Sequence, residues 1–176
     1  MSLALANEAP PFDLPGVDGR NHTLEEYDDA PILAIVWSCN HCPYVIAWEG
    51  RMKALQDEYG DRGFRLVAIS SNDAENYPAD SFEAMRARAK SQEFNFDYLY
   101  DEDQSVAGKY GPERTPEVFL FDRDRRLVYH GAIDDSRDET NVTQQYVRDA
   151  IEALLAGQDP PLSETPPVGC TVKWRG

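Results

Sequence analysis

The first half of the chain contains two continuous apolar runs, and between them lies a segment in which apolar residues recur with the spacing of a helix. Residues 32–37 (ILAIVW) and 64–70 (FRLVAIS) are rich in β-branched and aromatic residues, which is typical of strands buried on both faces. Between these runs, apolar residues recur at steps of three and four, namely Val45, Trp48, Met52, Leu55 and Tyr59. This spacing predicts an amphipathic helix that ends at the glycines at 60 and 63.

The second half of the chain predicts shorter elements. Asp80 with Glu83 is a capping pattern, which predicts a helix from Asp80 through about Lys90. The elements expected after it are a short strand at 96–100, a small helix at 106–110, a hairpin of strands 117–122 and 126–131, and a helix opening at 141–144. The proline-rich residues 158–176 predict an extended C-terminal tail.

This order of elements predicts an α/β fold. A strand, a helix and a second strand form a parallel βαβ unit, and the later hairpin adds antiparallel strands. We therefore expect a central mixed sheet flanked by helices. The length of 176 residues fits one domain over residues 1–176.

The charge balance excludes some classes of partner. The chain has 32 Asp and Glu residues against 17 Lys and Arg, a formal net charge of −15. Such a surface repels nucleic acid and anionic lipid, so we expect neither as a partner. The excess is that of an ordinary acidic protein or, as we favour, of adaptation to a salty cytoplasm that screens the repulsion.

The apolar segments are too short for membrane insertion. No run of about 18 apolar residues is present, so no membrane partner is expected. The N-terminal residues MSLALANEAPPF lack the basic start of a secretory signal, and we expect a cytoplasmic location.

The candidate chemistry lies in the stretch WSCNHCPYV, residues 37–45, where the first predicted strand ends. Cys39 and Cys42 form a Cys-x-x-Cys motif, which has three interpretations: a redox pair, half of a metal site, or two small buried residues. A reducing cytoplasm favours the first two. A zinc site would need Cys170 and one of three histidines as further ligands, His22, His41 or His130.

The position of the motif predicts a reactive thiol. The carboxyl ends of parallel strands collect functional groups, and the N-terminus of the following helix stabilises a thiolate. We therefore expect a lowered pKa for Cys39, with Cys42 one turn further into the helix and more deeply buried. His41 adds positive charge when protonated, and Pro43 is tolerated in the first turn of a helix.

Several segments together resemble the thioredoxin superfamily, in its thioredoxin-like and peroxiredoxin-like (thiol-specific antioxidant-like) branch. They are FDLPGVDGR, CNHCP, DEDQSVAGKYG, RTPEVFLFD, GAIDD and the closing GCTVKW. The resemblance implies a thioredoxin-like fold with an N-terminal hairpin and a helical insertion. It also implies a thiol–disulfide oxidoreductase with a role in redox homeostasis, in which Cys39 attacks a substrate disulfide and Cys42 resolves the mixed disulfide.

The same resemblance implies the substrate site and the partners. Thr115 and Pro116, joined by a cis peptide bond, are expected to form the docking edge, with Trp37 and His41 as further substrate-binding residues. The expected partners are protein or small-molecule disulfides and a reductase or low-molecular-weight thiol as electron donor, with no cofactor and no metal. Cys170 is either a packed, reduced thiol or a third redox thiol.

Two departures from the family pattern keep alternatives open. Thioredoxins carry an acidic residue in the strand before the cysteines, whereas residues 32–37 have none, so His41, Glu117 or a water would have to act as the base. Peroxiredoxins carry a threonine where this chain has Val36. The alternatives are a thiol peroxidase that uses Cys39 and, ranked lower, a metal-binding module.

The charge excess leads to a testable expectation. If the surface is salt-adapted, the midpoint of thermal unfolding rises substantially between low and molar potassium chloride, because salt screens repulsion among the carboxylates. Differential scanning calorimetry measures this midpoint, and a flat or falling response would leave only the interpretation of an ordinary acidic protein.

Overall fold

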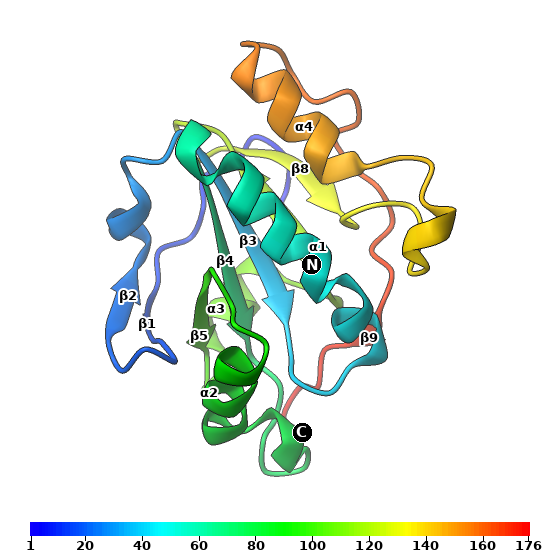
Figure 1. Ribbon diagram of the computed structural model, residues 1–176. Coiled ribbons are helices and arrows are strands. Elements are labelled where there is room, and N and C mark those ends of the chain that lie inside the picture. The colour runs from blue at the N-terminus through cyan, green and yellow to red at the C-terminus, as the bar shows by residue number, and fades with distance from the viewer.

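The computed structural model describes residues 1–176 and is built around a five-stranded mixed sheet in the order β5-β4-β3-β7-β8 (Figure 1). The strands are β3 (Ile32–Ser38), β4 (Phe64–Ser70), β5 (Asp97–Tyr100), β7 (Glu117–Phe121) and β8 (Leu127–Gly131). The strands β3, β4 and β5 are parallel, whereas β7 is antiparallel to both β3 and β8. The predicted βαβ unit and the late hairpin are therefore confirmed.

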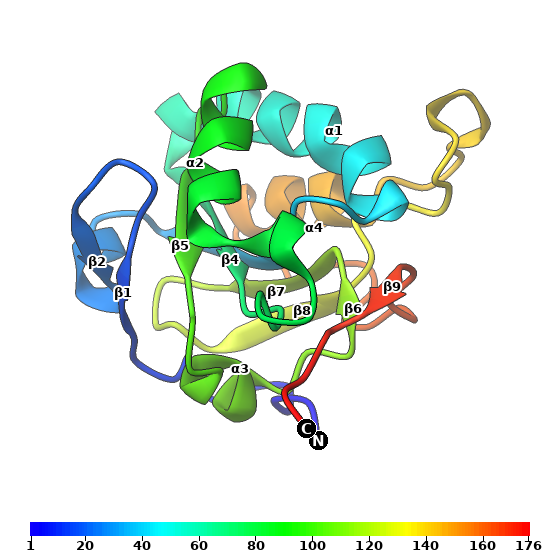
Figure 2. The same ribbon diagram turned by 90° about the horizontal axis from the view of Figure 1, so that it is seen from below.

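The helices lie on both faces of the sheet. The helices α1 (Pro43–Tyr59), α2 (Phe82–Ser91) and α4 (Tyr146–Leu155) cover one face. The short helix α3 (Ser105–Tyr110) and the N-terminal hairpin of β1 (Asp13–Pro15) and β2 (Asn21–Thr23) cover the other (Figure 2). No helix has the length and apolarity that a membrane crossing requires.

The central strand β3 is buried along its whole length. Its side chains alternate between two cores, with Ile32, Ala34 and Val36 in one and Leu33, Ile35 and Trp37 in the other. Burial on both faces explains why the sequence here is a continuous apolar run and does not alternate. It also fixes the direction in which the chain leaves the sheet at Ser38, directly before the first cysteine.

Two helices begin later than the sequence predicts. Helix α2 starts at Phe82, because Ser81 is its N-cap and its Oγ accepts the backbone N–H of Ala84 at 3.1 Å. Asp80 belongs to the preceding 3₁₀ turn (Pro78–Asp80), and its carboxylate is turned into the protein. Helix α4 starts at Tyr146, since residues Glu139–Asn141 form a separate 3₁₀ turn.

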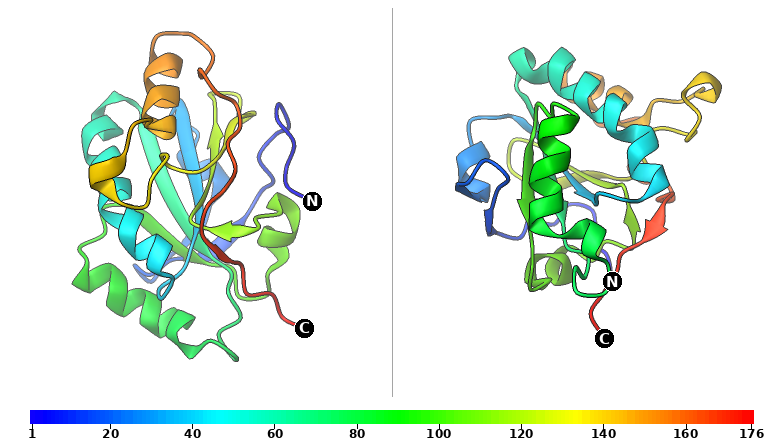
Figure 3. Two further views of the ribbon diagram at one scale, coloured as in Figure 1. Left: turned by 90° about the vertical axis from the view of Figure 1, so that its right-hand side faces the viewer. Right: turned by 60° about the horizontal axis from the view of Figure 1, so that its bottom comes forward.

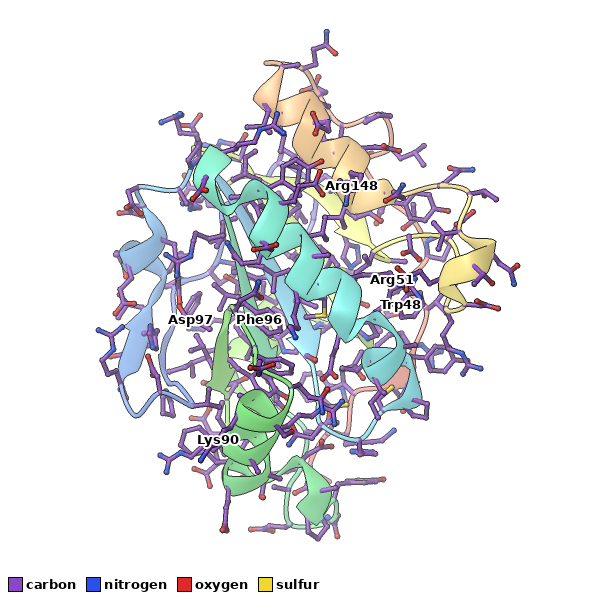
Figure 4. The ribbon with its side chains drawn as sticks, viewed as in Figure 1. Trp48, Arg51, Lys90, Phe96, Asp97 and Arg148 are labelled. Atoms are coloured by element: carbon purple, nitrogen blue, oxygen red, sulfur yellow. The ribbon has the colours of Figure 1, made fainter.

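A hydrogen bond and an ion pair join helix α1 to the loop that follows β8. Asp134 accepts the indole N–H of Trp48 at 2.8 Å and forms an ion pair with Arg51 at 2.7 Å. Figure 4 labels both side chains on α1, facing this loop. Trp48 and Asp134 are buried, so the contact is shielded from solvent and holds the N-terminal half of α1 in place.

The tail is extended, as predicted, but docks along the body of the protein (Figure 3). Backbone hydrogen bonds of 3.0 Å join His130 of β8 to Ser163 and Thr165. The strand β9 (Cys170–Thr171) then pairs antiparallel with β6 (Arg114–Thr115). Gly169 permits this approach, because a Cβ atom there would overlap the carbonyl oxygen of Thr115.

His22, on strand β2 of the N-terminal hairpin, is surrounded by three carboxylates. Its ring is buried, with Nδ1 2.8 Å from Glu26, Nε2 2.9 Å from Asp18, and Asp97 at 3.8 Å (Asp97 is labelled in Figure 4). Burial opposes protonation, but the hydrogen bonds to Asp18 and Glu26 outweigh it and raise the pKa of His22. The charged ring therefore stabilises the folded state.

A His22→Gln variant tests this linkage. A raised folded-state pKa means that the stabilisation is complete below the unfolded pKa of 6.5 and is lost as pH rises through the folded value. We expect the substitution to lower the free energy of unfolding by about 1–2 kcal/mol at pH 6, and by clearly less at pH 9. Urea unfolding at both pH values measures the difference, and an equal loss at both would contradict a charged His22.

Candidate functional site

The cysteine motif lies in the irregular segment between β3 and α1. Cys39 follows the last residue of β3, and α1 begins at Pro43, which occupies the first helical turn as predicted. Cys42 is therefore the N-cap residue, with extended backbone angles (φ −67°, ψ 124°). The amino end of the helix therefore lies at Cys42, whereas Cys39 lies four residues before the first helical residue.

All three cysteines of the chain are free and meet in one cluster. Cys39 and Cys42 are 1% and 0% exposed and pack with Val45, whereas Cys170 is partly exposed and packs against the same group. Cys42 is thus scarcely more buried than Cys39. Cys170 reaches the cluster because β9 pairs with β6, which places it opposite Thr115.

Thr115 contacts both cysteines of the motif. The predicted cis peptide bond between Thr115 and Pro116 is present. The hydroxyl oxygen of Thr115 is 3.7 Å from the Cys39 sulfur, and its backbone carbonyl accepts the Cys42 thiol at 3.4 Å. The expectation that this segment lies against the cysteine pair is confirmed.

The two thiols of the motif titrate as a coupled pair. Hydrogen bonding from the Cys39 thiol lowers the pKa of Cys42 to about 4, with a smaller contribution from Cys170. The same contact raises the pKa of Cys39, and burial and the nearby charge of Asp80 raise it further. The prediction of a lowered pKa for Cys39 is wrong, because the Cys39 thiol donates its hydrogen bond to the Cys42 sulfur and because burial and Asp80 disfavour a charge on Cys39.

A buried carboxylate, Asp80, lies beside Cys39. It is fully buried and accepts the backbone N–H of Asn40 at 2.7 Å and the side-chain amide of Asn72 at 2.9 Å. His41 Nδ1 is 2.6 Å from the second carboxylate oxygen, and the Cys39 sulfur lies within 4.8 Å of both groups. An acidic side chain therefore lies beside Cys39, on the segment between β4 and α2 and not on β3.

Sequence reasoning assigned Asp80 to a helix cap and so missed this role. Ser81 is an equally good N-cap residue, and its presence leaves Asp80 without a local function. That redundancy is the one signal in the sequence that marks Asp80 for another use.

The His41 side chain connects the buried carboxylate to the surface. Its Nδ1 is buried against Asp80, but 36% of the side chain is exposed, and its ring stacks on Tyr77 at 6.1 Å. The ring of His41 therefore lies between the buried carboxylate of Asp80 and solvent.

Trp37 does not reach the surface. It is 0% exposed, its indole N–H donates to Ser71 at 3.2 Å, and its ring packs on Tyr110 and Phe119. The prediction that Trp37 binds substrate is therefore wrong: its position in β3 directs the side chain into the core between the sheet and α3. Glu117, a candidate base, binds the Glu113 N–H and lies 3.3 Å from His130 instead.

The zinc ligand set considered from the sequence is only partly assembled. His22 is held by Asp18 and Glu26 in the N-terminal hairpin, and His130 by the carboxylates of Glu117 and Glu164. Of the set, the three cysteines lie in one cluster, and His41 groups with Cys39 and with Asp80, which the set did not include. Both oxygens of Asp80 already accept hydrogen bonds, which favours a positioning role over ligation.

Comparison with solved structures gives two full-length matches. A hypothetical protein from Sinorhizobium meliloti 1021 is 39% identical, with a TM-score of 0.94 over 100% of this chain and 97% of that one. An uncharacterized conserved protein from Geobacillus kaustophilus is 42% identical, with a TM-score of 0.93 over 98% of this chain and 93% of that one. Both therefore share the tail as well as the sheet.

More distant matches carry functional names. The family described as AhpC/TSA matches residues 5–130. The thiol-disulfide oxidoreductase ResA of Bacillus anthracis is 21% identical over 128 residues, which are 72% of this chain and 68% of that protein. The thioredoxin domain of a thiol-disulfide oxidoreductase from Bacteroides vulgatus is 16% identical, with a TM-score of 0.61 over 73% of this chain and 89% of that one, a likeness in fold alone.

The coupled titration can be measured in a Cys170→Ser background, where only the motif thiols remain. We expect one thiol to react with iodoacetamide at an apparent pKa well below the free-thiol value of about 8.5, and the second to titrate above it. Asp80→Asn removes the negative charge beside Cys39 and is expected to lower the upper step by about one unit. Mass spectrometry of the labelled peptides against pH gives both steps.

The exposed Asp28→Asn substitution is the matched control for the loss of one negative charge, and is expected to move neither step. An upper step that is the same in Asp80→Asn and in Asp28→Asn would show that Asp80 does not act on Cys39.

Proposed function

The chain belongs to the AhpC/TSA family and is an oxidoreductase with a thioredoxin-like fold, and we propose that it exchanges disulfides through the pair Cys39 and Cys42. The observation that carries this proposal is the meeting of two free, buried cysteines against Thr115, whose hydroxyl oxygen lies 3.7 Å from the Cys39 sulfur and whose carbonyl accepts the Cys42 thiol. A thiolate is the nucleophile of disulfide exchange, and the lowered pKa of Cys42 favours a thiolate within the pair.

In the proposed reaction, Cys39 attacks the substrate disulfide. As its sulfur bonds to one substrate sulfur, its proton passes to the Cys42 thiolate and the other substrate sulfur leaves as a thiolate. Cys42 then loses that proton to solvent and attacks Cys39, which releases the second substrate thiolate. The protein gains the Cys39–Cys42 disulfide, and two electrons pass to the substrate.

The contacts of Cys39 support this order of attack. The Thr115 hydroxyl, 3.7 Å away, is placed to donate to a Cys39 thiolate once the proton has moved. The Cys42 sulfur instead faces the Thr115 carbonyl oxygen, to which its thiol donates once it has taken up the proton of Cys39. The two contacts therefore favour the state with charge on Cys39 during attack.

The surroundings of the pair suit an apolar polypeptide substrate. Three large apolar side chains near the motif are exposed, Ile46 at 48%, Tyr77 at 40% and Val168 at 46%. Apolar side chains exposed next to one another are typical of protein contact sites. Protein disulfides are thus the favoured substrates, small disulfides are included, and a reductase or low-molecular-weight thiol in the cytoplasm would restore the reduced pair.

A thiol peroxidase is the second candidate, and one observation favours it. The hydroxyl of Thr115 lies beside the Cys39 sulfur and could orient a peroxide, although Val36 stands where peroxiredoxins carry threonine. Consumption of hydrogen peroxide by the reduced protein, compared with reduction of a disulfide substrate, separates the two activities.

Trapping with Cys42→Ser tests the proposed exchange. Without the resolving thiol, a mixed disulfide with insulin or with oxidised glutathione is expected to accumulate at Cys39, and turnover of insulin reduction to fall by about 100-fold or more. Non-reducing electrophoresis and peptide mass mapping identify the adduct. The Cys39→Ser/Cys42→Ser double variant is the control that should trap nothing at this position.

The order of attack is decided by comparing the two single variants. An adduct that forms on Cys42 in Cys39→Ser, and not on Cys39 in Cys42→Ser, would reverse the assigned roles. Failure of either cysteine to form an adduct would contradict the exchange itself.

A further inference from the structure

The edge on which a substrate would dock already carries a strand of the same chain. Thr115 and Cys170 are register partners in the antiparallel pair of β6 and β9 (Figure 2). An extended peptide that binds by strand addition uses such an edge, with its side chains at alternate positions entering the site. The tail thus occupies the place of a bound substrate and presents a cysteine there.

The tail is held firmly in this position. Gly169 lets its backbone pass against Thr115, and the backbone N–H of Val172 donates to the carbonyl of Glu113 at 3.1 Å. Beyond it, the N–H of Lys173 donates to the Asn72 side chain at 2.9 Å. The contact of Cys170 with the cysteine cluster is therefore part of the folded structure.

Cys170 differs from the motif cysteines in its access to solvent. Cys39 and Cys42 are at most 1% exposed, whereas Cys170 is partly exposed. Its thiol packs on the cluster and interacts with the Cys42 sulfur. Disulfide exchange needs direct contact between an external sulfur and a protein sulfur, and Cys170 is the cysteine that external thiols reach most readily.

We propose that Cys170 is a built-in exchange partner of Cys42, so that the oxidised protein interconverts between a Cys39–Cys42 and a Cys42–Cys170 disulfide. The proposal rests on the proposed function, because it takes the disulfide of the motif as its starting point. The Cys42–Cys170 disulfide includes the partly exposed Cys170. A thiol reductant such as glutathione can therefore attack the Cys170 sulfur from solvent.

The exchange is balanced within the protein. The Cys170 thiolate attacks the Cys42 sulfur, the Cys39–Cys42 bond breaks, and its electron pair stays on Cys39, which takes up a proton from solvent in place of the one that Cys170 released. Nothing is oxidised or reduced overall. An external thiolate then attacks Cys170, and the Cys42 sulfur leaves as the thiolate that the helix terminus stabilises.

The charges in the site favour attack by Cys170 on the Cys39–Cys42 disulfide. Burial, together with the neighbouring Cys42 thiolate, raises the pKa of Cys170 to about 11 in the reduced protein. Once Cys42 is bound in a disulfide its charge is gone, and one cause of that elevation disappears. Cys170 therefore becomes a better nucleophile in the state in which the exchange requires it.

Three single substitutions, each of one cysteine by serine, separate this proposal from the proposed function. Each full-length variant is oxidised in a glutathione redox buffer, its free thiols are counted, and its disulfides are located by non-reducing peptide mass mapping. We expect Cys170→Ser to form Cys39–Cys42, Cys39→Ser to form Cys42–Cys170, and Cys42→Ser to form no internal disulfide. Circular dichroism of each reduced variant establishes that it is folded.

The outcomes distinguish the two ideas. A Cys170→Ser protein that forms its disulfide, beside a Cys39→Ser protein that keeps two free or glutathionylated thiols, would overturn the inference and leave the proposed function standing. Failure of Cys170→Ser to form a disulfide would count against the motif pair instead. In the wild type, mapping is expected to find both disulfides, and reduction of oxidised protein by glutathione is expected to slow roughly tenfold or more in Cys170→Ser.

Discussion

The arrangement of the three cysteines depends on the contacts of Thr115. Its carbonyl oxygen accepts the Cys42 thiol, its hydroxyl lies beside Cys39, and its backbone pairs with Cys170. One residue thus brings together sulfurs that are up to 131 positions apart in the chain. Thr115 is itself positioned by β7, which starts two residues later and pairs with β3, the strand that delivers Cys39. The sheet therefore sets the geometry of the site.

The buried carboxylate of Asp80 is stabilised by a second set of contacts in the site. Asp80 is a carboxylate without exposure to water, and a carboxylate in that position requires hydrogen bonds or a positive partner. Asn40 and Asn72 donate hydrogen bonds to it, and His41 Nδ1 lies 2.6 Å from one of its oxygens. Two of these residues are the spacer residues of the Cys-x-x-Cys motif, so both residues between the cysteines contact Asp80. The charge of Asp80 in turn contributes to the raised pKa of Cys39.

Much of the fold follows from local pattern, and the site follows only in part. The runs at 32–37 and 64–70 are apolar because both faces of those strands are buried, so their assignment needed no knowledge of neighbours. The N-cap Ser81 and the buried Asp80 could not be told apart locally, because both residue types cap helices and only long-range contacts show which one turns inward. The family resemblance placed Trp37 among the substrate-binding residues, but the alternation of β3 places it in the core.

The sequence by itself determined the class of chemistry: two cysteines three residues apart, after a buried strand and before a proline that starts a helix. These are local features, set by the periodicity of the side chains and by the limits that proline places on the backbone. The tertiary structure decided where the buried carboxylate comes from and what Cys170 touches. Each of those depends on contacts between segments 40 to 130 positions apart, and a pairing of strands such as β6 with β9 leaves no periodic signal in two residues of sequence.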